Sequence, residues 1–220
     1  MSDLKKQNEK SLSTLLLISL IPAYLSILTY HWDYIVSLAQ SQPFVALGQL
    51  AAVGLGPIVC LKFFLHSIVN ILNNSFKERL VHLRWHDPLP AGYTDKLIHK
   101  DPRLHVDHLP EIVKPLLASD MSPKERNSYW YQYIYKRVRD LSAVSNTHRR
   151  YLLYRDATAG VFVVTIFLFL SDIICRTAWT LPLISPLAYV VSSLYLLLLL
   201  GSAKNAGERM VTGAIANFNK

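Results

Sequence analysis

Six of the eight histidines lie in one polar segment of this 220-residue chain, and histidine suits both metal binding and acid–base chemistry near neutral pH. They are His82, His86, His99, His105, His108 and His148. His82 and His86 have the four-residue spacing of a helical metal pair, but no glutamate follows His82 as a helical zinc-hydrolase motif requires. Nucleophile elbows, Walker loops and dinucleotide fingerprints do not occur in the sequence. We therefore interpret the histidines as structural, and predict no metal site, no cofactor and no enzymatic activity.

Aromatic and basic side chains alternate along residues 129–139, which read Tyr-Trp-Tyr-Gln-Tyr-Ile-Tyr-Lys-Arg-Val-Arg. On a helix, such a run can stack on unpaired bases and neutralise phosphates, or can bind a protein through aromatic and arginine anchors. It can also be an ordinary packing face with a solvated basic side. If the run binds a partner, we expect the docking residues to be Trp130, Tyr133, Arg137 and Arg139.

Charged residues also stand at the edges of apolar blocks, where an unpaired charge is costly. Lys62 follows an apolar run, and we expect its ammonium to extend toward lipid headgroups. Arg155 directly precedes Asp156 and another apolar block, and we expect it to contact anionic headgroups together with Arg149 and Arg150. We predict membrane or conformational roles for Lys62, Arg155 and Asp156.

Asp172 and Arg176 form a further charged pair near the far end of the same apolar block. Their four-residue spacing, with the acid first, is the favourable orientation for a helical ion pair. We predict that the pair forms and that it has a conformational role in the membrane.

One long helix would position most of these side chains. Ser122, Pro123 and Glu125 supply an N-cap hydroxyl, a first-turn proline and a capping-box glutamate. Neither glycine nor proline occurs between Lys124 and Ala159, and the polar part passes directly into the apolar residues 161–170. The sequence thus predicts an unbroken helix from Pro123 to Ile174. It would span about 78 Å at about 1.5 Å per residue, far more than the ~30 Å core of a bilayer.

Composition places the chain among polytopic membrane proteins, because 51% of its residues are hydrophobic and they gather in four blocks. The net charge is +8, and fifteen of the 23 lysines and arginines lie in residues 74–156. The first predicted loop, Tyr30–Pro43, has none. By the positive-inside rule, the central segment and both termini are expected to be cytoplasmic.

The predicted fold is all-α, with four transmembrane helices and a helical cytoplasmic stalk between the second and third. The spans cover about residues 12–30, 44–61, 157–174 and 187–200. The corresponding division is a tail (1–11), a first transmembrane hairpin (12–73), a cytoplasmic helical domain (74–156), a second hairpin (157–200) and a tail (201–220). The first span is interpreted as retained rather than cleaved as a signal peptide, because no small-x-small site follows it.

The cytoplasmic domain is expected to contain two antiparallel stalk helices, Lys62–His86 and Pro123–Asp156. On the second stalk, a stripe at helical spacing should pack on the first; its members are Trp130, Ile134, Val138, Leu141, Ser145, His148 and Leu152. Between the stalks, Thr94–Ser119 should hold two or three short helices. The two cysteines, Cys60 and Cys175, are read as small buried hydrophobic residues and indicate no disulfide framework.

Four motifs in order resemble the small membrane effectors encoded beside retron reverse transcriptases. They are Asp87-Pro-Leu-Pro-Ala-Gly92, Lys100-Asp-Pro-Arg-Leu104, Asn127-Ser-Tyr-Trp-Tyr131 and Tyr151-Leu-Leu-Tyr-Arg-Asp156, and the resemblance covers about residues 74–174. It implies a bacterial inner-membrane protein of an abortive-infection system. Such a protein, released or activated by a reverse transcriptase with its RNA–DNA product, would damage the membrane of an infected cell.

We therefore predict an antiviral membrane effector that acts through conformational change. It would contact lipid, a reverse transcriptase with its RNA–DNA product and, on oligomerisation, further copies of itself. Two other classes remain as alternatives. A transporter or channel accessory subunit would need polar residues along one pathway, and few are present. A membrane-bound metalloenzyme would use the histidine cluster, and metal analysis of the purified protein would decide it.

Overall fold

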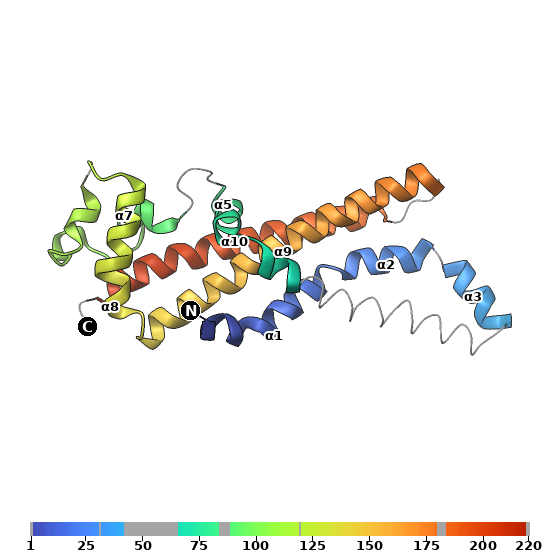
Figure 1. Cartoon of the computed structure of the whole chain (residues 1–220), viewed down its shortest axis with the longest axis horizontal. Helices are drawn as coiled ribbons and strands as arrows, with labels where there is room; N and C mark the ends of the chain where they lie inside the picture. Colours follow the sequence, from blue (N-terminus) through green and yellow to red (C-terminus); the bar gives the residue numbers. More distant parts are fainter. Residues whose placement is uncertain are drawn as a thin grey trace. The chain divides into compact units, whose positions relative to one another are not determined.

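The computed structural model describes residues 2–30, 32–41, 66–83, 89–118, 120–179 and 184–218, and every regular element in these ranges is a helix (Figure 1). The predicted all-α class is confirmed for them. Three helical segments are long and apolar enough to cross a membrane, namely Lys6–Tyr30, Ser142–Thr177 and Pro186–Ala216. The second predicted span lies outside the described residues, and so do Lys62, Cys60 and His86.

The chain divides into two compact units, each assembled from segments that are distant in sequence. The helical unit comprises residues 1–8, 73–156 and 199–220, and the apolar unit comprises residues 9–72 and 157–198. Two long helices, α9 (Ser142–Trp179) and α10 (Pro186–Ala216), supply residues to both.

The described part of the helical unit contains several short helices beside the ends of α9 and α10, where two long stalk helices with a short connector were predicted. The short helices are α5 (Asn74–His82), η1 (Pro90–Tyr93), α6 (Thr94–Lys100), η2 (Val106–His108), η3 (Lys114–Leu117), α7 (Pro123–Tyr129), the π-helical turn η4 (Trp130–Tyr135) and α8 (Lys136–Val138). The capping box at the start of α7 is confirmed, because the Ser122 side chain accepts from the Glu125 backbone N–H and the Glu125 carboxylate accepts from the Ser122 backbone N–H. The short helices expected in Thr94–Ser119 are present as α6, η2 and η3.

The prediction of an unbroken helix from Pro123 to Ile174 is wrong, because the chain turns at residues 139–141, between α8 and α9 (Figure 1). The turn is closed by the Leu141 N–H, which donates to the Val138 carbonyl at 3.0 Å. It allows residues before and after it, such as Ile134 and Val144, to enter the same core. Burial of apolar side chains on both sides therefore outweighs the helix propensity of the turn.

The first stalk also differs from its prediction as one helix over Lys62–His86. Within the described part, residues 66–71 are helical, the helix is interrupted at Leu72 and Asn73, and α5 then begins. The Asn73 side chain accepts from the Ser75 backbone N–H, which is an N-cap hydrogen bond that competes with helix continuation. α5 ends at Leu83, whose φ of 51° is in the left-handed region.

The end of α10 belongs to the core of the helical unit, although residues 201–220 were predicted to be a tail. Met210, Val211, Ala214 and Ile215 are buried beside the short helices. Their spacing places them on one face of a helix. The C-terminal segment therefore holds this unit together.

The helix α1 (Ser2–Ile18) is divided between the units, and its residues from 9 onward belong to the apolar unit. This unit also contains α2 (Ile21–Tyr30), α3 (Trp32–Ser41), residues 66–71 and the apolar parts of α9 and α10. α1 and α2 are separated at Ser19 and Leu20, close to the kink expected at Pro22. The segment predicted as the first loop, Tyr30–Pro43, contains α3.

Gly160 on α9 marks a close helix approach in the apolar unit. A Cβ atom there would lie 2.4 Å from Leu16 Cδ2 and 2.8 Å from Val69 Cγ2, so Gly160→Ala should destabilise the packing by about 1–3 kcal/mol. We expect a lower midpoint of thermal unfolding in detergent. Gly201→Ala is the control, because a Cβ there meets no atom within 4 Å. Equal midpoints for the two variants would contradict the close contact.

Candidate functional site

A cluster of buried charges joins α5 to α9 in the helical unit. Arg155, on α9, has a side chain that is 2% exposed, and its guanidinium donates to three acceptors on two helices. Nε and Nη2 reach Asp156 Oδ1 at 3.0 and 2.9 Å, Nη1 reaches Glu78 Oε1 at 3.1 Å, and Nη2 reaches Asn74 Oδ1 at 3.1 Å. The planar guanidinium therefore bridges the two helices.

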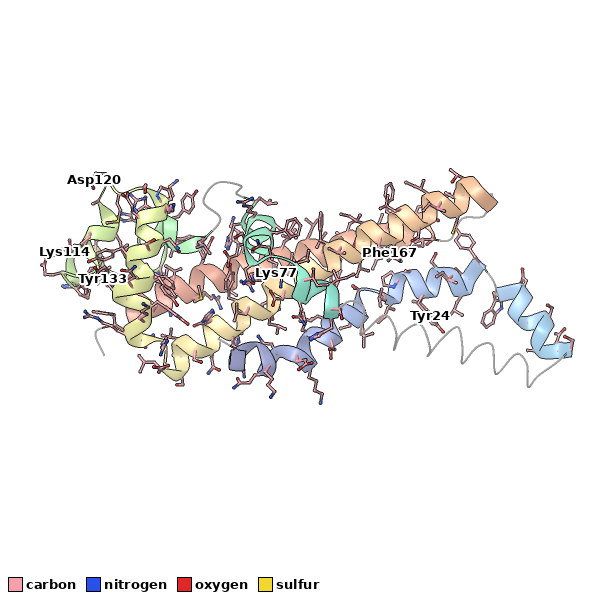
Figure 2. All side chains as sticks on the ribbon, in the orientation of Figure 1. Tyr24, Lys77, Lys114, Asp120, Tyr133 and Phe167 are labelled. Carbon is pink, nitrogen blue, oxygen red and sulfur yellow. The ribbon has the colours of Figure 1, made fainter. Side chains whose placement is uncertain are left out.

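Lys77 brings a second buried cation into this cluster. Its side chain is 1% exposed, and its Nζ lies 3.3 Å from Asp156 Oδ1 (Figure 2). Asp156 thus faces two cations at once, Lys77 and Arg155. We call Asn74, Lys77, Glu78, Arg155 and Asp156 the ionic cluster. Two cations and two carboxylates balance its formal charge.

Glu78 is the weaker of the two carboxylate partners. Burial raises the pKa of its carboxyl, and the nearby Arg155 guanidinium opposes this shift without cancelling it. The geometry agrees, because Glu78 pairs with Arg155, whereas Asp156 contacts both Arg155 and Lys77. We infer that Asp156 carries most of the charge compensation.

The predicted headgroup contact of Arg155 disagrees with this burial, since the guanidinium is enclosed by α5. The sequence predicted the α5 residues as part of a stalk helix but did not indicate Lys77 or Glu78 as partners of Arg155. These residues are 77 or more positions from Arg155, and no helical spacing links them. Arg149 donates to Gln7 Oε1 at 3.4 Å, while Arg150 is exposed.

The aromatic and basic run is split between core and surface. Trp130 is only 4% exposed and packs in the core beside Ile134 and Tyr135, so it is not available for docking. Tyr133 is 44% exposed (Figure 2). Arg137 lies over the Phe218 ring at 5.8 Å, and Arg139 pairs with Asp140 at 3.5 Å. Of the four predicted docking residues, Tyr133, Arg137 and Arg139 are therefore the ones exposed at the surface.

The described histidines have separate surroundings. His82 is buried and lies 3.4 Å from the Tyr151 hydroxyl, and the Tyr135 hydroxyl hydrogen-bonds to His148 Nδ1. His105 and His108 are exposed and pack edge to face. Among the described residues, no group of three histidine, cysteine, aspartate or glutamate side chains is placed to hold a metal ion.

The predicted pair of Asp172 and Arg176 is formed in the apolar unit, with Arg176 Nε 2.8 Å from Asp172 Oδ2. Both side chains also bind the backbone of Ile184, which lies just before α10. Asp172 Oδ1 accepts from the Ile184 N–H, and Arg176 Nη2 donates to the Ile184 carbonyl, both at 3.1 Å. The pair thus fastens the end of α9 to the start of α10.

No protein-family model, curated protein or solved structure matches the chain.

Proposed function

We propose that the protein is an effector that increases membrane permeability and that its helical unit restrains it at rest. The observation that carries this proposal is the composition of α9, a single helix from Ser142 to Trp179. Its first half contributes Arg155 and Asp156 to the buried ionic cluster, and its second half exposes Phe167 (Figure 2). Phe169, Leu170 and Ile174 are exposed on the same half. A displacement of the first half can therefore be transmitted along the backbone into the apolar half.

The exposed apolar side chains support a lipid environment for that half. Ile166, Phe167, Phe169, Leu170, Ile173 and Ile174 are each 42–60% exposed, and α10 adds Leu187, Val190, Leu194, Leu197 and Leu198. Soluble monomers rarely expose apolar surface of this extent. Lipid chains would cover it, and rearrangement of the helices within lipid would provide the leak.

The ionic cluster supports the restraint. A buried ion pair contributes little net stability, but breaking it by removing one partner is strongly destabilising, by about 3–5 kcal/mol. Such a cluster therefore favours one arrangement of α5 and α9 over alternatives in which the charges would be unpaired. A partner that moves α5 would release α9.

The biological setting we propose is anti-phage defence, based on the resemblance to retron-associated effectors. The partner would be a reverse transcriptase with its RNA–DNA product, docked at Tyr133, Arg137 and Arg139. Alanine substitution of these three residues should release a co-purified partner while leaving membrane insertion intact, because aromatic and arginine anchors can each contribute about 2 kcal/mol or more. Unchanged co-purification would reject this surface, and Lys124→Ala, at an exposed basic residue of α7, is the control.

The permeability proposal is tested by expressing the wild-type protein alone and with its genomic neighbours. Entry of a membrane-impermeant dye and loss of membrane potential are followed by flow cytometry at matched protein abundance. We expect dye entry when the protein is expressed alone and protection when its partner is present. A protein that never admits dye or depolarises the membrane in either state would be a passive anchor, and the proposal would fail.

The proposed location is the bacterial inner membrane, with both termini in the cytoplasm. Reporter fusions at Asp95 and after Lys220 should be active only as cytoplasmic reporters, and one at Gln40 only as an external reporter. The basic central segment motivates this expectation. An external signal from the Asp95 fusion would contradict the proposed cytoplasmic location of the central segment.

A further inference from the structure

A cleft of about 550 Å³ lies in the helical unit between α6 with its following turn, the start of α9 and the end of α10. Its volume falls within the range of small-molecule sites, about 300–1,000 Å³. Apolar lining comes from Leu97, Pro102 and Ala143, and the rest is mostly polar or charged. The proposed permeability function uses none of these residues.

One face of α10 forms a wall of the cleft. Asn205, Glu208, Arg209, Thr212, Gly213 and Asn217 line it, at the spacing of a helical stripe. The opposite face carries the buried Val211 and Ala214. A Cβ atom added to Gly213 would meet nothing within 4 Å. Space therefore remains beside the helix at the centre of this wall.

The acidic groups in the lining are already paired. Arg103 holds Asp101 through two contacts, Nε–Oδ1 at 2.9 Å and Nη2–Oδ2 at 2.6 Å, and the pKa of Asp101 is well below its usual range because of this hydrogen bonding. Lys100 Nζ lies 3.1 Å from Glu208 Oε2. Arg209 is exposed, and no acidic side chain pairs with it among the described residues. The cleft therefore presents a guanidinium whose charge is uncompensated.

A smaller pocket of about 170 Å³ adjoins the cleft, because Leu97, Lys100 and Glu208 line both. It adds two more lysines, Lys96 and Lys204. Together, the two neighbouring pockets are lined by five basic residues, Lys96, Lys100, Arg103, Lys204 and Arg209, against the two carboxylates described above. This excess of three positive charges favours a ligand with more than one negative charge.

We propose that this cleft binds a small molecule bearing phosphate groups, with Arg209 as its principal anchor. Guanidinium groups bind phosphate oxygens through paired, charge-assisted hydrogen bonds. The lysines of the adjoining pocket would neutralise further phosphate charge, and the apolar lining would contact the organic part. A nucleotide and a lipid headgroup share this chemistry.

The experiment uses the full-length protein in phosphatidylcholine nanodiscs, with ATP, adenosine and inorganic phosphate as probes in titration calorimetry. ATP should bind, and adenosine should not. Arg209→Ala should weaken ATP binding by about tenfold or more, the loss of one charge-assisted contact. Gly213→Trp should do the same by filling the cleft. Gly201→Trp should bind as the wild type, because Gly201 has equal open space but does not line the cleft.

A second arm tests the lipid source by counting the phosphatidylglycerol molecules that remain bound after purification from membranes, using native mass spectrometry. If the Gly213→Trp variant retains fewer phosphatidylglycerol molecules than the Gly201→Trp variant, the ligand is a lipid headgroup. Equal binding of ATP and adenosine would overturn the proposal. It would also be overturned if ATP does not bind and lipid retention does not differ between the two tryptophan variants. Dye entry in cells is a separate measurement, so the cleft and the permeability function can fail independently.

Discussion

Asp156→Asn is expected to lower the free energy of unfolding of the helical unit by about 3–5 kcal/mol. The substitution preserves the size of the side chain but removes the one carboxylate that both Lys77 and Arg155 contact. Those two cations are almost completely buried, so water cannot replace the lost charge. The cluster would change from neutral to a formal charge of +1. Chemical denaturation in detergent, followed by helical circular dichroism and by the fluorescence of the buried Trp130, measures the loss.

Glu78→Gln provides the matched control within the same cluster. Since burial raises the pKa of Glu78 despite Arg155, the ionised carboxylate gains less from the site than it loses in hydration. Its neutral amide should therefore change the free energy of unfolding by no more than about 1 kcal/mol, close to the usual effect of an ordinary substitution. Equal losses for the two variants would contradict the assignment of Asp156 as the central partner.

The same variants test the restraint on permeability. If the ionic cluster holds α9 at rest, Asp156→Asn should increase dye entry even when the partner is co-expressed, and Glu78→Gln should not. Arg150→Met is a further control on α9, because Arg150 is exposed one turn before Arg155. If Asp156→Asn lowers the stability of the cluster but does not increase dye entry, the cluster does not control permeability.

Local signals in the sequence predicted local structure well. The capping box at Ser122 and Glu125 and the pair of Asp172 and Arg176 are both formed, because each depends on residues three or four positions apart on one helix. The helical class and three candidate spans follow from composition and periodicity alone. These features need no knowledge of distant partners.

Features that depend on distant residues were not predictable in this way. The turn at residues 139–141 contains neither glycine nor proline, and it forms because Ile134 and Val144 share a core. Leu141 lies in this turn rather than on a helix, so it is 43% exposed although it continues the 3.6-residue period of the buried Trp130, Ile134 and Val138. The stripe on the second stalk predicted packing on the first stalk, but no spacing indicated that Asn74, Lys77 and Glu78 would contact Arg155 and Asp156.

The second large effect is expected at Asp172 in the apolar unit. Asp172→Ala removes the acceptor for Arg176 Nε and for the Ile184 backbone N–H, and it leaves that N–H without this hydrogen bond at a site where Ile184 is 1% exposed. An unsatisfied buried donor costs about 1–3 kcal/mol. Arg176 can still extend into water or headgroups, so the lost fastening between α9 and α10 dominates. We expect faster dye entry than in the wild type at matched abundance and with the partner present.

Asp172→Asn tests the hydrogen bond to the Ile184 backbone separately from the ion pair with Arg176. Its amide oxygen can still accept from the Ile184 N–H, whereas its ionic attraction to Arg176 is lost. If the backbone contact holds the two helices together, Asp172→Asn should keep dye entry near the wild-type rate and Asp172→Ala should raise it. If both variants leak equally, the ion pair is the restraint. If neither leaks and both accumulate normally, the junction of α9 and α10 does not control permeability, and the release step must lie elsewhere in the chain.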